Sequence, residues 1–217
     1  MVKGKKILIT RPEHDFGTKY LSFWAKEVIE TANRKGFDVI DLHREKAEQK
    51  EFEGRVNKTN PSLIMLNGHG DENTVTGHDN KTIIEKGKNE KLLKKRITYA
   101  VSCDSAKNLG ESCADNDTTY IGYEKSFIFN LDRKYLNRPL DDQRAKRFLD
   151  SSNQVPLSLL KGHPSKEASE RSKEAFKREV GSLLTSLHSD PDSQADAKDL
   201  WWDMQCQVCL GAQNKKL

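Results

Sequence analysis

The segment that most restricts the possible folds is a short apolar run at residues 62–66, Ser-Leu-Ile-Met-Leu, bounded by Pro61 and Gly68. A strand with one solvent-facing side alternates apolar and polar residues, whereas the last four positions of this run are all apolar. Such a run is typical of a strand covered on both faces in a parallel sheet. We therefore expect an α/β fold built around this strand.

Other short apolar runs and helical periodicities alternate along the first part of the chain. Strands are predicted at residues 5–10, 37–42 and 97–101, and helices at residues 20–32, 44–58 and 83–95. Residues 118–129, interrupted by Gly122, are expected to add one or two strands. Alternating strands and helices favour right-handed crossovers, and hence a mostly parallel sheet with helices on both faces.

The composition changes near residue 141 to charged, helical sequence. Apolar residues from 168 to 187 lie at helical spacing after Pro164, residues 189–194 are predicted to be a linker, and residues 200–208 a last amphipathic helix. In that helix Trp201 is predicted to lie in the core and Trp202 in solvent. The 217 residues suit one domain. We expect an α/β core at residues 1–135 and a C-terminal helical extension packed on it at residues 136–217.

Charge and hydropathy exclude several classes of function. The 37 basic and 33 acidic residues are interspersed and give a net charge of +4, so no one-signed face for nucleic acid is expected. No segment approaches the roughly 20 consecutive apolar residues of a membrane span. The apolar part of the first ten residues is too short for a signal peptide. We therefore expect a cytoplasmic protein whose four cysteines are reduced.

Candidate reactive residues follow the third and fourth predicted strands. The third leads into Asn67-Gly68-His69-Gly70, and the fourth into Ser102-Cys103-Asp104-Ser105-Ala106. Ligands of open α/β sheets bind outside the carboxyl ends of the strands, so neighbouring strands would bring His69 and Cys103 to one rim. An adjacent imidazole can take the proton of a thiol and make it nucleophilic. The glycines allow a tight turn around His69, and the N–H of Gly70 would be free to bind an oxyanion.

These segments resemble the caspase-hemoglobinase fold of clan CD cysteine peptidases, which includes caspases, metacaspases, legumain, gingipains, clostripain, separase and the bacterial CHAT proteases. The likeness is greatest to the prokaryotic CHAT and gingipain-like branch, and it covers about residues 5–130. Further segments that resemble this branch are Leu109-Gly110-Glu111 and Tyr120-Ile121-Gly122-Tyr123. The caspase signature Gln-Ala-Cys-x-Gly is not met, because Val101 and Ser102 precede the cysteine.

The resemblance implies a cysteine endopeptidase with Cys103 as nucleophile and His69 as general base and acid. It also implies that the N–H groups of Gly70 and Cys103 form the oxyanion hole. Protein or peptide substrates and no cofactor are implied, and a regulatory protein partner is left open. The pocket for the P1 side chain would follow the first strand, where Arg11 would favour an acidic residue and Asp15 a basic one. Asp15 or Thr18 would cap the helix that begins there.

Two other clusters and one other function are alternatives. His69, Asp71, His78 and Asp79 lie within eleven positions, but their spacing matches no recognised metal site, and we expect no bound metal. Cys206-Gln-Val-Cys209 has the spacing of a redox motif or half a zinc site, yet it lies near a helix end, where the dipole raises thiol pKa values. The alternative function is a catalytically silent caspase-like or flavodoxin-like module that binds a protein partner.

Overall fold

The computed structural model describes residues 4–185 and 191–217. The strands are β1 (Lys6–Arg11), β2 (Asp38–His43), β3 (Leu63–Asn67), β4 (Thr74–Thr76), β5 (Thr82–Glu85), β6 (Ile97–Val101), β7 (Thr119–Tyr123) and β8 (Gln207–Gly211). The α-helices are α1 (Phe16–Arg34), α2 (Gln49–Thr59), α3 (Glu111–Cys113), α4 (Gln143–Leu160), α5 (Ser165–Thr185) and α6 (Pro191–Cys206). In these two stretches of chain, no helix combines the length and the apolar character that crossing a membrane requires.

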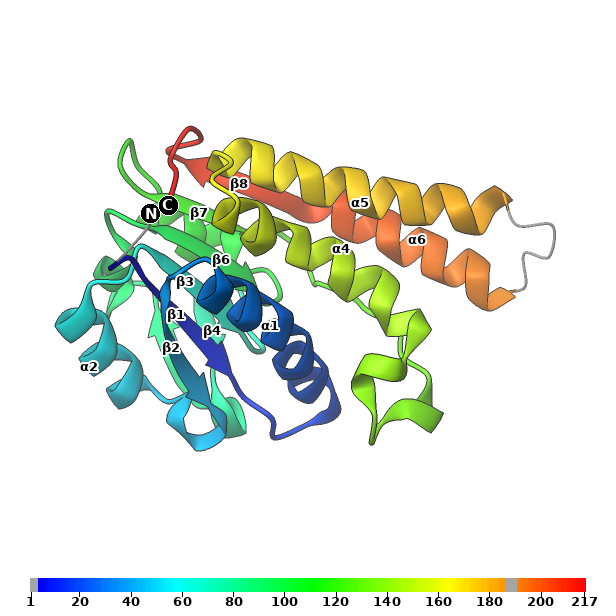
Figure 1. The fold of residues 1–217 in the computed structure, drawn as a ribbon, viewed down its shortest axis with the longest axis horizontal. Coiled ribbons are helices and arrows are strands. Elements are labelled where there is room, and N and C mark those ends of the chain that lie inside the picture. The colour runs from blue at the N-terminus through cyan, green and yellow to red at the C-terminus, as the bar shows by residue number, and fades with distance from the viewer. Residues whose placement is uncertain (1–3, 186–190) are drawn as a thin grey trace.

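A six-stranded sheet forms the centre of the molecule, with the strand order β2-β1-β3-β6-β7-β8. Adjacent strands from β2 to β7 are parallel, and β8 is antiparallel to β7 (Figure 1). The expectation of an α/β fold with a mostly parallel sheet is therefore confirmed. Strands β3 and β6 are direct neighbours, and Asn67 at the end of one pairs with Val101 at the end of the other. The loops that follow these two strands consequently leave the sheet side by side.

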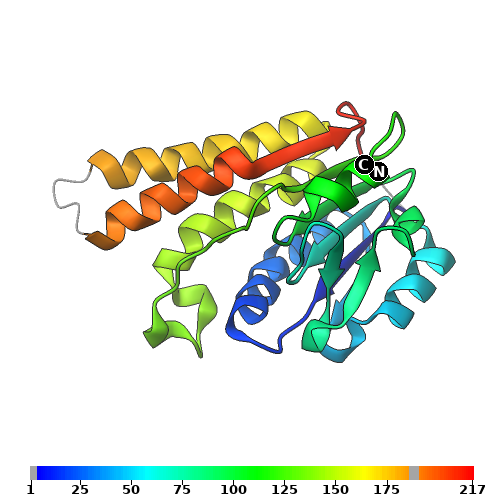
Figure 2. The same ribbon diagram turned by 180° about the vertical axis from the view of Figure 1, so that it is seen from behind.

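Each face of the sheet has its own apolar core, because successive side chains of a strand point to opposite faces. In β1, Ile7 and Ile9 face the core formed with α1, α4, α5 and α6, whereas Leu8 faces the core formed with α2 and the β4–β5 hairpin. Figures 1 and 2 show the sheet and the helices that cover it from opposite sides. Strands β3 and β6 are buried along their whole length, as the uninterrupted apolar run predicts.

The connection from β3 to β6 differs from the prediction, because residues 83–95 do not form a helix. Instead, β5 pairs with β4 in an antiparallel hairpin, and only a 3-10 turn, Glu90–Leu93, follows it. The side chain of Asn89 fixes the bend: its Nδ2 donates to the Ile83 carbonyl at 2.9 Å and its Oδ1 accepts from the Glu85 N–H at 2.8 Å. Ile83 and Ile84 both contribute to the core. The predicted run of alternating strands and helices is therefore wrong at this crossover.

The region after residue 141 is helical as predicted, but its end was not anticipated. Helix α6 stops at Cys206, and the chain continues as the edge strand β8, so the extension also completes the sheet. Leu200 is fully buried, whereas Trp201 is 51% exposed, so the prediction that Trp201 lies in the core is wrong. Of the predicted linker, residues 189–190 lie outside the described residues, and residues 191–194 are the first turn of α6.

Helix α4 contains a proline that is compensated from the sheet. Pro156 has no N–H, so the carbonyl of Ser152, one turn earlier, loses its partner within the helix. The buried Tyr99 hydroxyl of β6 donates to that carbonyl at 2.9 Å. This hydrogen bond ties α4 to the strand that leads into the Cys103 loop.

Candidate functional site

The loop that carries His69 is fixed at the end of β3. There Asn67 donates from its side-chain Nδ2 to the Thr10 carbonyl at 2.8 Å, and its N–H donates to Thr10 Oγ1 at 3.0 Å. Beyond the strand, the His69 carbonyl accepts the N–H of Thr76 in β4 at 2.9 Å. The backbone of His69 is thus held between β1 on one side and the β4–β5 hairpin on the other.

The glycines beside His69 are required by close packing. A Cβ atom on Gly68 would lie 2.0 Å from the Thr76 carbonyl oxygen. One on Gly70 would lie 2.1 Å from Ser102 Oγ and 2.5 Å from the Thr74 carbonyl oxygen. Gly70 therefore brings the His69 loop against the residue that immediately precedes Cys103.

The loop that carries Cys103 turns sharply after β6. Asp104 adopts a left-handed conformation with φ of 58°, and its N–H donates to the Lys125 carbonyl at 3.2 Å. The Cys103 thiol is half-buried and donates to the Phe127 carbonyl at 3.8 Å. Segment 124–131, which follows β7, thus lies directly over the cysteine.

His69 and Cys103 line the same small pocket, of about 80 Å³. Its walls are mainly apolar and include Leu21 of α1 together with Phe127 and Phe129. The juxtaposition that the sequence predicts for His69 and Cys103 is therefore present at the carboxyl ends of β3 and β6. Within the described residues, no hydrogen bond joins the thiol to the imidazole: the thiol donates to Phe127 and the imidazole bonds to Asp15.

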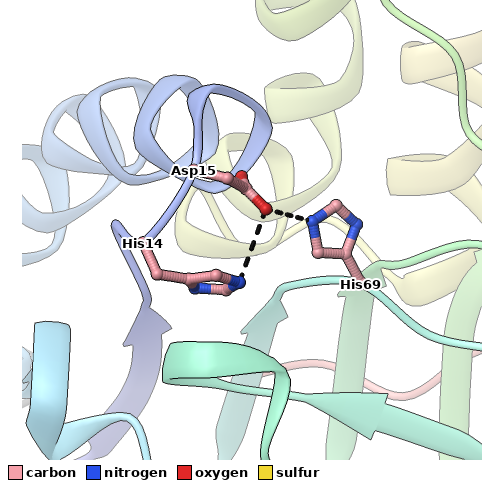
Figure 3. A group of neighbouring side chains, drawn as sticks. All are labelled: His14, Asp15 and His69. Carbon is pink, nitrogen blue, oxygen red and sulfur yellow. Dashed lines mark hydrogen bonds and ion pairs between the residues drawn. The ribbon is translucent and has the colours of Figure 1, made fainter.

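Asp15 connects the start of α1 to His69 (Figure 3). Its Oδ1 caps the helix by accepting the Thr18 N–H at 2.7 Å, while its Oδ2 lies 2.6 Å from His69 Nε2. A carboxylate can only accept here, so Nε2 carries a proton, and in the neutral ring Nδ1 then has the lone pair. Burial opposes ionisation, but the bonds from Thr18 and His69 outweigh it and lower the pKa of Asp15. Asp15 is therefore a carboxylate that fixes the tautomer of His69.

The N–H groups expected to bind an oxyanion are available. Among the residues that the structure describes, neither the N–H of Gly70 nor that of Cys103 donates a hydrogen bond to another protein group. Both belong to the loops that meet at the pocket. Unpaired donors at such a position can stabilise charge that develops on a substrate oxygen.

The surroundings of Cys103 favour the neutral thiol. Burial raises the pKa of Cys103, the backbone of Phe127 opposes part of that rise, and the nearby Asp104 carboxylate adds to it. A neutral thiol is a poor nucleophile, so reaction at Cys103 needs a base to remove its proton. The lone pair on His69 Nδ1 can serve as that base, since Nε2 is committed to Asp15.

Arg11 does not line this pocket. Its guanidinium forms two hydrogen bonds with the Asp41 carboxylate, at 2.8 and 2.6 Å, and a third with Ser22 Oγ at 3.0 Å. The side chain is only 7% exposed. It joins β1, β2 and α1 in the interior.

The four residues weighed as a metal site are not gathered together. Asp71 Oδ1 accepts the N–H groups of Asn73 and Thr74 at the start of the hairpin. His78 Nδ1 accepts the Glu13 N–H, with 3.4 Å between the two nitrogens, and its ring contacts that of His14. The group that does converge, among the residues described, is His14, Asp15 and His69, whose ligand atoms all lie within 4.8 Å of one another.

The remaining cysteines and a second, larger hollow offer less chemistry. Burial raises the pKa values of Cys113 and Cys209 to about 11, and it also raises that of Cys206. Cys206 ends α6 and Cys209 lies within β8, so the C-x-x-C pair is split between two elements. A larger, open hollow of about 750 Å³ beside α2 is lined by charged and polar side chains and by no histidine or cysteine.

No protein-family model matches the sequence, and a search of curated proteins finds no significant match. The site is therefore interpreted from its own geometry. The sequence analysis identified His69 and Cys103 but missed the contact between Asp15 and His69, and it assigned no role to His14. The capping position of Asp15 was the available signal, because a cap fixes one carboxylate oxygen and leaves the other free.

Proposed function

We propose that this protein is a caspase-like cysteine endopeptidase that cleaves protein or peptide substrates through an acyl-enzyme on Cys103. The observation that carries the proposal is the shared pocket: a thiol and an imidazole, from the ends of neighbouring parallel strands, face the same space. The unpaired N–H groups of Gly70 and Cys103 beside it add further support.

In the proposed reaction, substrate displaces the thiol from the Phe127 carbonyl and His69 Nδ1 takes its proton. The sulfur attacks the scissile carbonyl carbon, an S–C bond forms, and the carbonyl electron pair moves to the oxygen. The N–H groups of Gly70 and Cys103 donate to that oxyanion. When the tetrahedral centre collapses, the C–N bond breaks and His69 gives the proton to the leaving amine. Water, activated by the same imidazole, then hydrolyses the thioester.

Asp15 acts in this scheme as a positioning residue. Its Oδ2 accepts the proton on His69 Nε2, which leaves Nδ1 unprotonated and able to accept from the thiol. The carboxylate also stabilises the imidazolium that forms during the reaction. Because its other oxygen caps α1, the carboxylate cannot turn away without loss of the cap.

The pocket geometry favours a small apolar P1 side chain. The Arg11 guanidinium is bound to Asp41 and Ser22, and Asp15 is bound to His69, so neither charge is left to select a P1 residue. Leu21, Phe127 and Phe129 form the remaining walls. Fluorogenic peptides with Ala, Leu, Arg, Lys and Asp at P1 test this. Fastest cleavage after Arg or Lys would show that Asp15 determines the specificity, and fastest cleavage after Asp would show that Arg11 does.

Digestion of a peptide library tests the proposed activity. The parent is compared with Cys103→Ala and with Cys113→Ala, a matched change at a buried thiol outside the pocket. We expect cleavage by the parent and by Cys113→Ala and none by Cys103→Ala. Equal cleavage by the parent and Cys103→Ala would rule out the dyad.

The alternative, a silent protein-binding module, is favoured by one observation: the thiol is bound to the Phe127 carbonyl and burial raises its pKa. Alkylation by iodoacetamide distinguishes the two functions. In a peptidase, Cys103 is labelled faster than the other half-buried thiol, Cys209, and His69→Ala abolishes the difference. If Cys103 reacts no faster than Cys209 and the library stays intact, the silent module is the better assignment.

A further inference from the structure

Three potential metal ligands meet at the proposed dyad, and His69 belongs to both groups. His14 and Asp15 come from the loop before α1, and His69 comes from the loop after β3 (Figure 3). Asp15 Oδ2 lies 2.6 Å from His69 Nε2 and 3.4 Å from His14 Nε2. Two imidazole nitrogens and one carboxylate oxygen therefore face a common point.

The orientation of each ligand is set by the fold. The Asp15 carboxylate is anchored by its cap on α1, so Oδ2 is the oxygen that remains. The His14 side chain is only 10% exposed, and its ring makes T-shaped contacts with the rings of His69 and His78. Its Nδ1 is buried and, in the described part of the chain, has no hydrogen-bond partner. His69 is half exposed, which leaves an entry path from solvent.

We propose that His14, Asp15 and His69 bind a divalent transition metal ion of the zinc type, and that the bound ion switches the dyad off. Two histidines and one carboxylate with a water molecule form a recurrent zinc coordination set. Zn–N and Zn–O bonds of about 2.0–2.2 Å in a tetrahedron place ligand atoms roughly 3.4 Å apart. The His14 and Asp15 atoms already have this separation, so a small rotation of the half-exposed His69 ring completes the site.

The inhibitory effect follows from the ring tautomers, and this part of the inference rests on the proposed function. Without metal, Asp15 holds the proton on His69 Nε2, and Nδ1 can accept the thiol proton. A metal on Nε2 of the neutral ring moves that proton to Nδ1, which then cannot act as a base. At His14 the metal replaces the hydrogen bond between Nε2 and Asn80 Oδ1, which lie 3.1 Å apart, and breaks none at Nδ1, because that atom has no partner among the described residues.

Titration with Co²⁺ tests the site without using activity. Tetrahedral Co²⁺ bound by nitrogen and oxygen gives visible d–d bands, whereas thiolate ligands from Cys103, Cys206 or Cys209 would add sulfur-to-cobalt charge transfer in the near ultraviolet. We expect the first spectrum, displacement of Co²⁺ by Zn²⁺, and at least tenfold weaker binding in His14→Ala. The matched control is His163→Ala, which removes another carboxylate-paired histidine, one that lies just before α5 and pairs with Glu167 rather than belonging to the cluster.

Unchanged Co²⁺ binding by His14→Ala, or a spectrum dominated by thiolate charge transfer, would overturn the site. The switch is tested by the ratio of peptidase activity with Zn²⁺ to peptidase activity without it. In the parent we expect a ratio of one tenth or less, and we expect EDTA to restore the activity. In His14→Ala this ratio should remain near one. A parent that binds metal at the cluster but is not inhibited would overturn the switch alone. A parent without peptidase activity would refute the proposed function and leave the Co²⁺ test valid.

Discussion

Two regions of the molecule contain buried or half-buried polar groups and use them differently. At the carboxyl ends of β3 and β6, Cys103 and His69 each keep an atom that can react. On the flank formed by β8 and the helical extension, Gln207 is fully buried, and its side chain donates to Ser169 and accepts from Ser172. The first region places polar groups at loops that line a pocket, whereas the second uses them to fasten α5 to β8. A thiol or imidazole is thus a functional candidate where it lines a pocket and one of its reactive atoms can still be reached.

The largest effect is expected from the reactive groups themselves. His69→Ala and Cys103→Ala should each lower kcat/KM by about 10³-fold or more, and the double variant should be no worse, because nucleophile and base act as one unit. The free energy of unfolding should change little, since both side chains lie at the sheet rim. Initial rates on one fluorogenic peptide and urea unfolding give both quantities. If the two losses of kcat/KM multiply in the double variant, His69 and Cys103 do not act as one unit.

Gly70→Ala should damage both the site and the fold. The added Cβ would clash with Ser102 Oγ and the Thr74 carbonyl, so the loops of His69 and Cys103 must separate. We expect roughly a 10²-fold loss of activity and a destabilisation of about 1–3 kcal/mol. The control is Gly54→Ala in α2, where no atom lies within 4 Å of the added Cβ. It should stabilise the protein by about 0.5–1 kcal/mol; equal effects of the two changes would refute the close approach.

Asp15→Asn separates orientation of the imidazole from helix capping. Asparagine caps as well as aspartate, so stability should change by less than about 0.5 kcal/mol. Its amide would donate to His69 Nε2 and force the proton to Nδ1, and we expect kcat/KM to fall by about 10²-fold. Nitrogen chemical shifts of His69 should report the change of tautomer. Asp132→Asn, at the cap of the short helical turn Arg133–Tyr135, is the matched control and should alter neither quantity. An unchanged His69 spectrum in Asp15→Asn would contradict the assigned role.

The smallest effect is expected for Asp203 of α6, on the flank formed by β8 and the helical extension. Burial raises its pKa well above the usual value, and only one oxygen, Oδ1, has a partner, the Ile128 N–H at 2.9 Å. The unfolded chain releases this proton near pH 4 while the folded protein keeps it, so stability falls as pH rises from about 4 toward the raised value. Asp203→Asn should remove a decline on the order of 1 kcal/mol between pH 5 and 7. Asp192→Asn changes an 80% exposed carboxylate and should leave that decline in place. Urea unfolding at several pH values measures the free energy of unfolding of each protein. If it depends on pH in the same way in the parent and in Asp203→Asn, the burial effect is refuted.

Prediction from the sequence succeeded for strands whose burial is visible in their own apolar residues. It failed for features that depend on contacts between residues far apart in the sequence. Apolar runs identified β3 and β6, and the glycines and strand ends located His69 and Cys103. The hairpin strand β5 was missed because Ile83, Ile84, Leu92 and Leu93 also suit a helix. Strand β8 was missed because Val208 continues the spacing of α6. The contact of Asp15 with His69 depends on where two loops meet in space, which residue spacing does not encode.

The place of β8 at the edge of the sheet has a consequence for how the chain folds during synthesis. Its partner β7 ends at Tyr123, but β8 begins only at Gln207, after three helices have been made. Until Gln207–Gly211 leaves the ribosome, the outer edge of β7 has unpaired N–H and carbonyl groups and can recruit a strand from another chain. The completed sheet therefore depends on a late, long-range pairing, which slows folding. We expect truncation before Gln207 to yield aggregates built on the β7 edge.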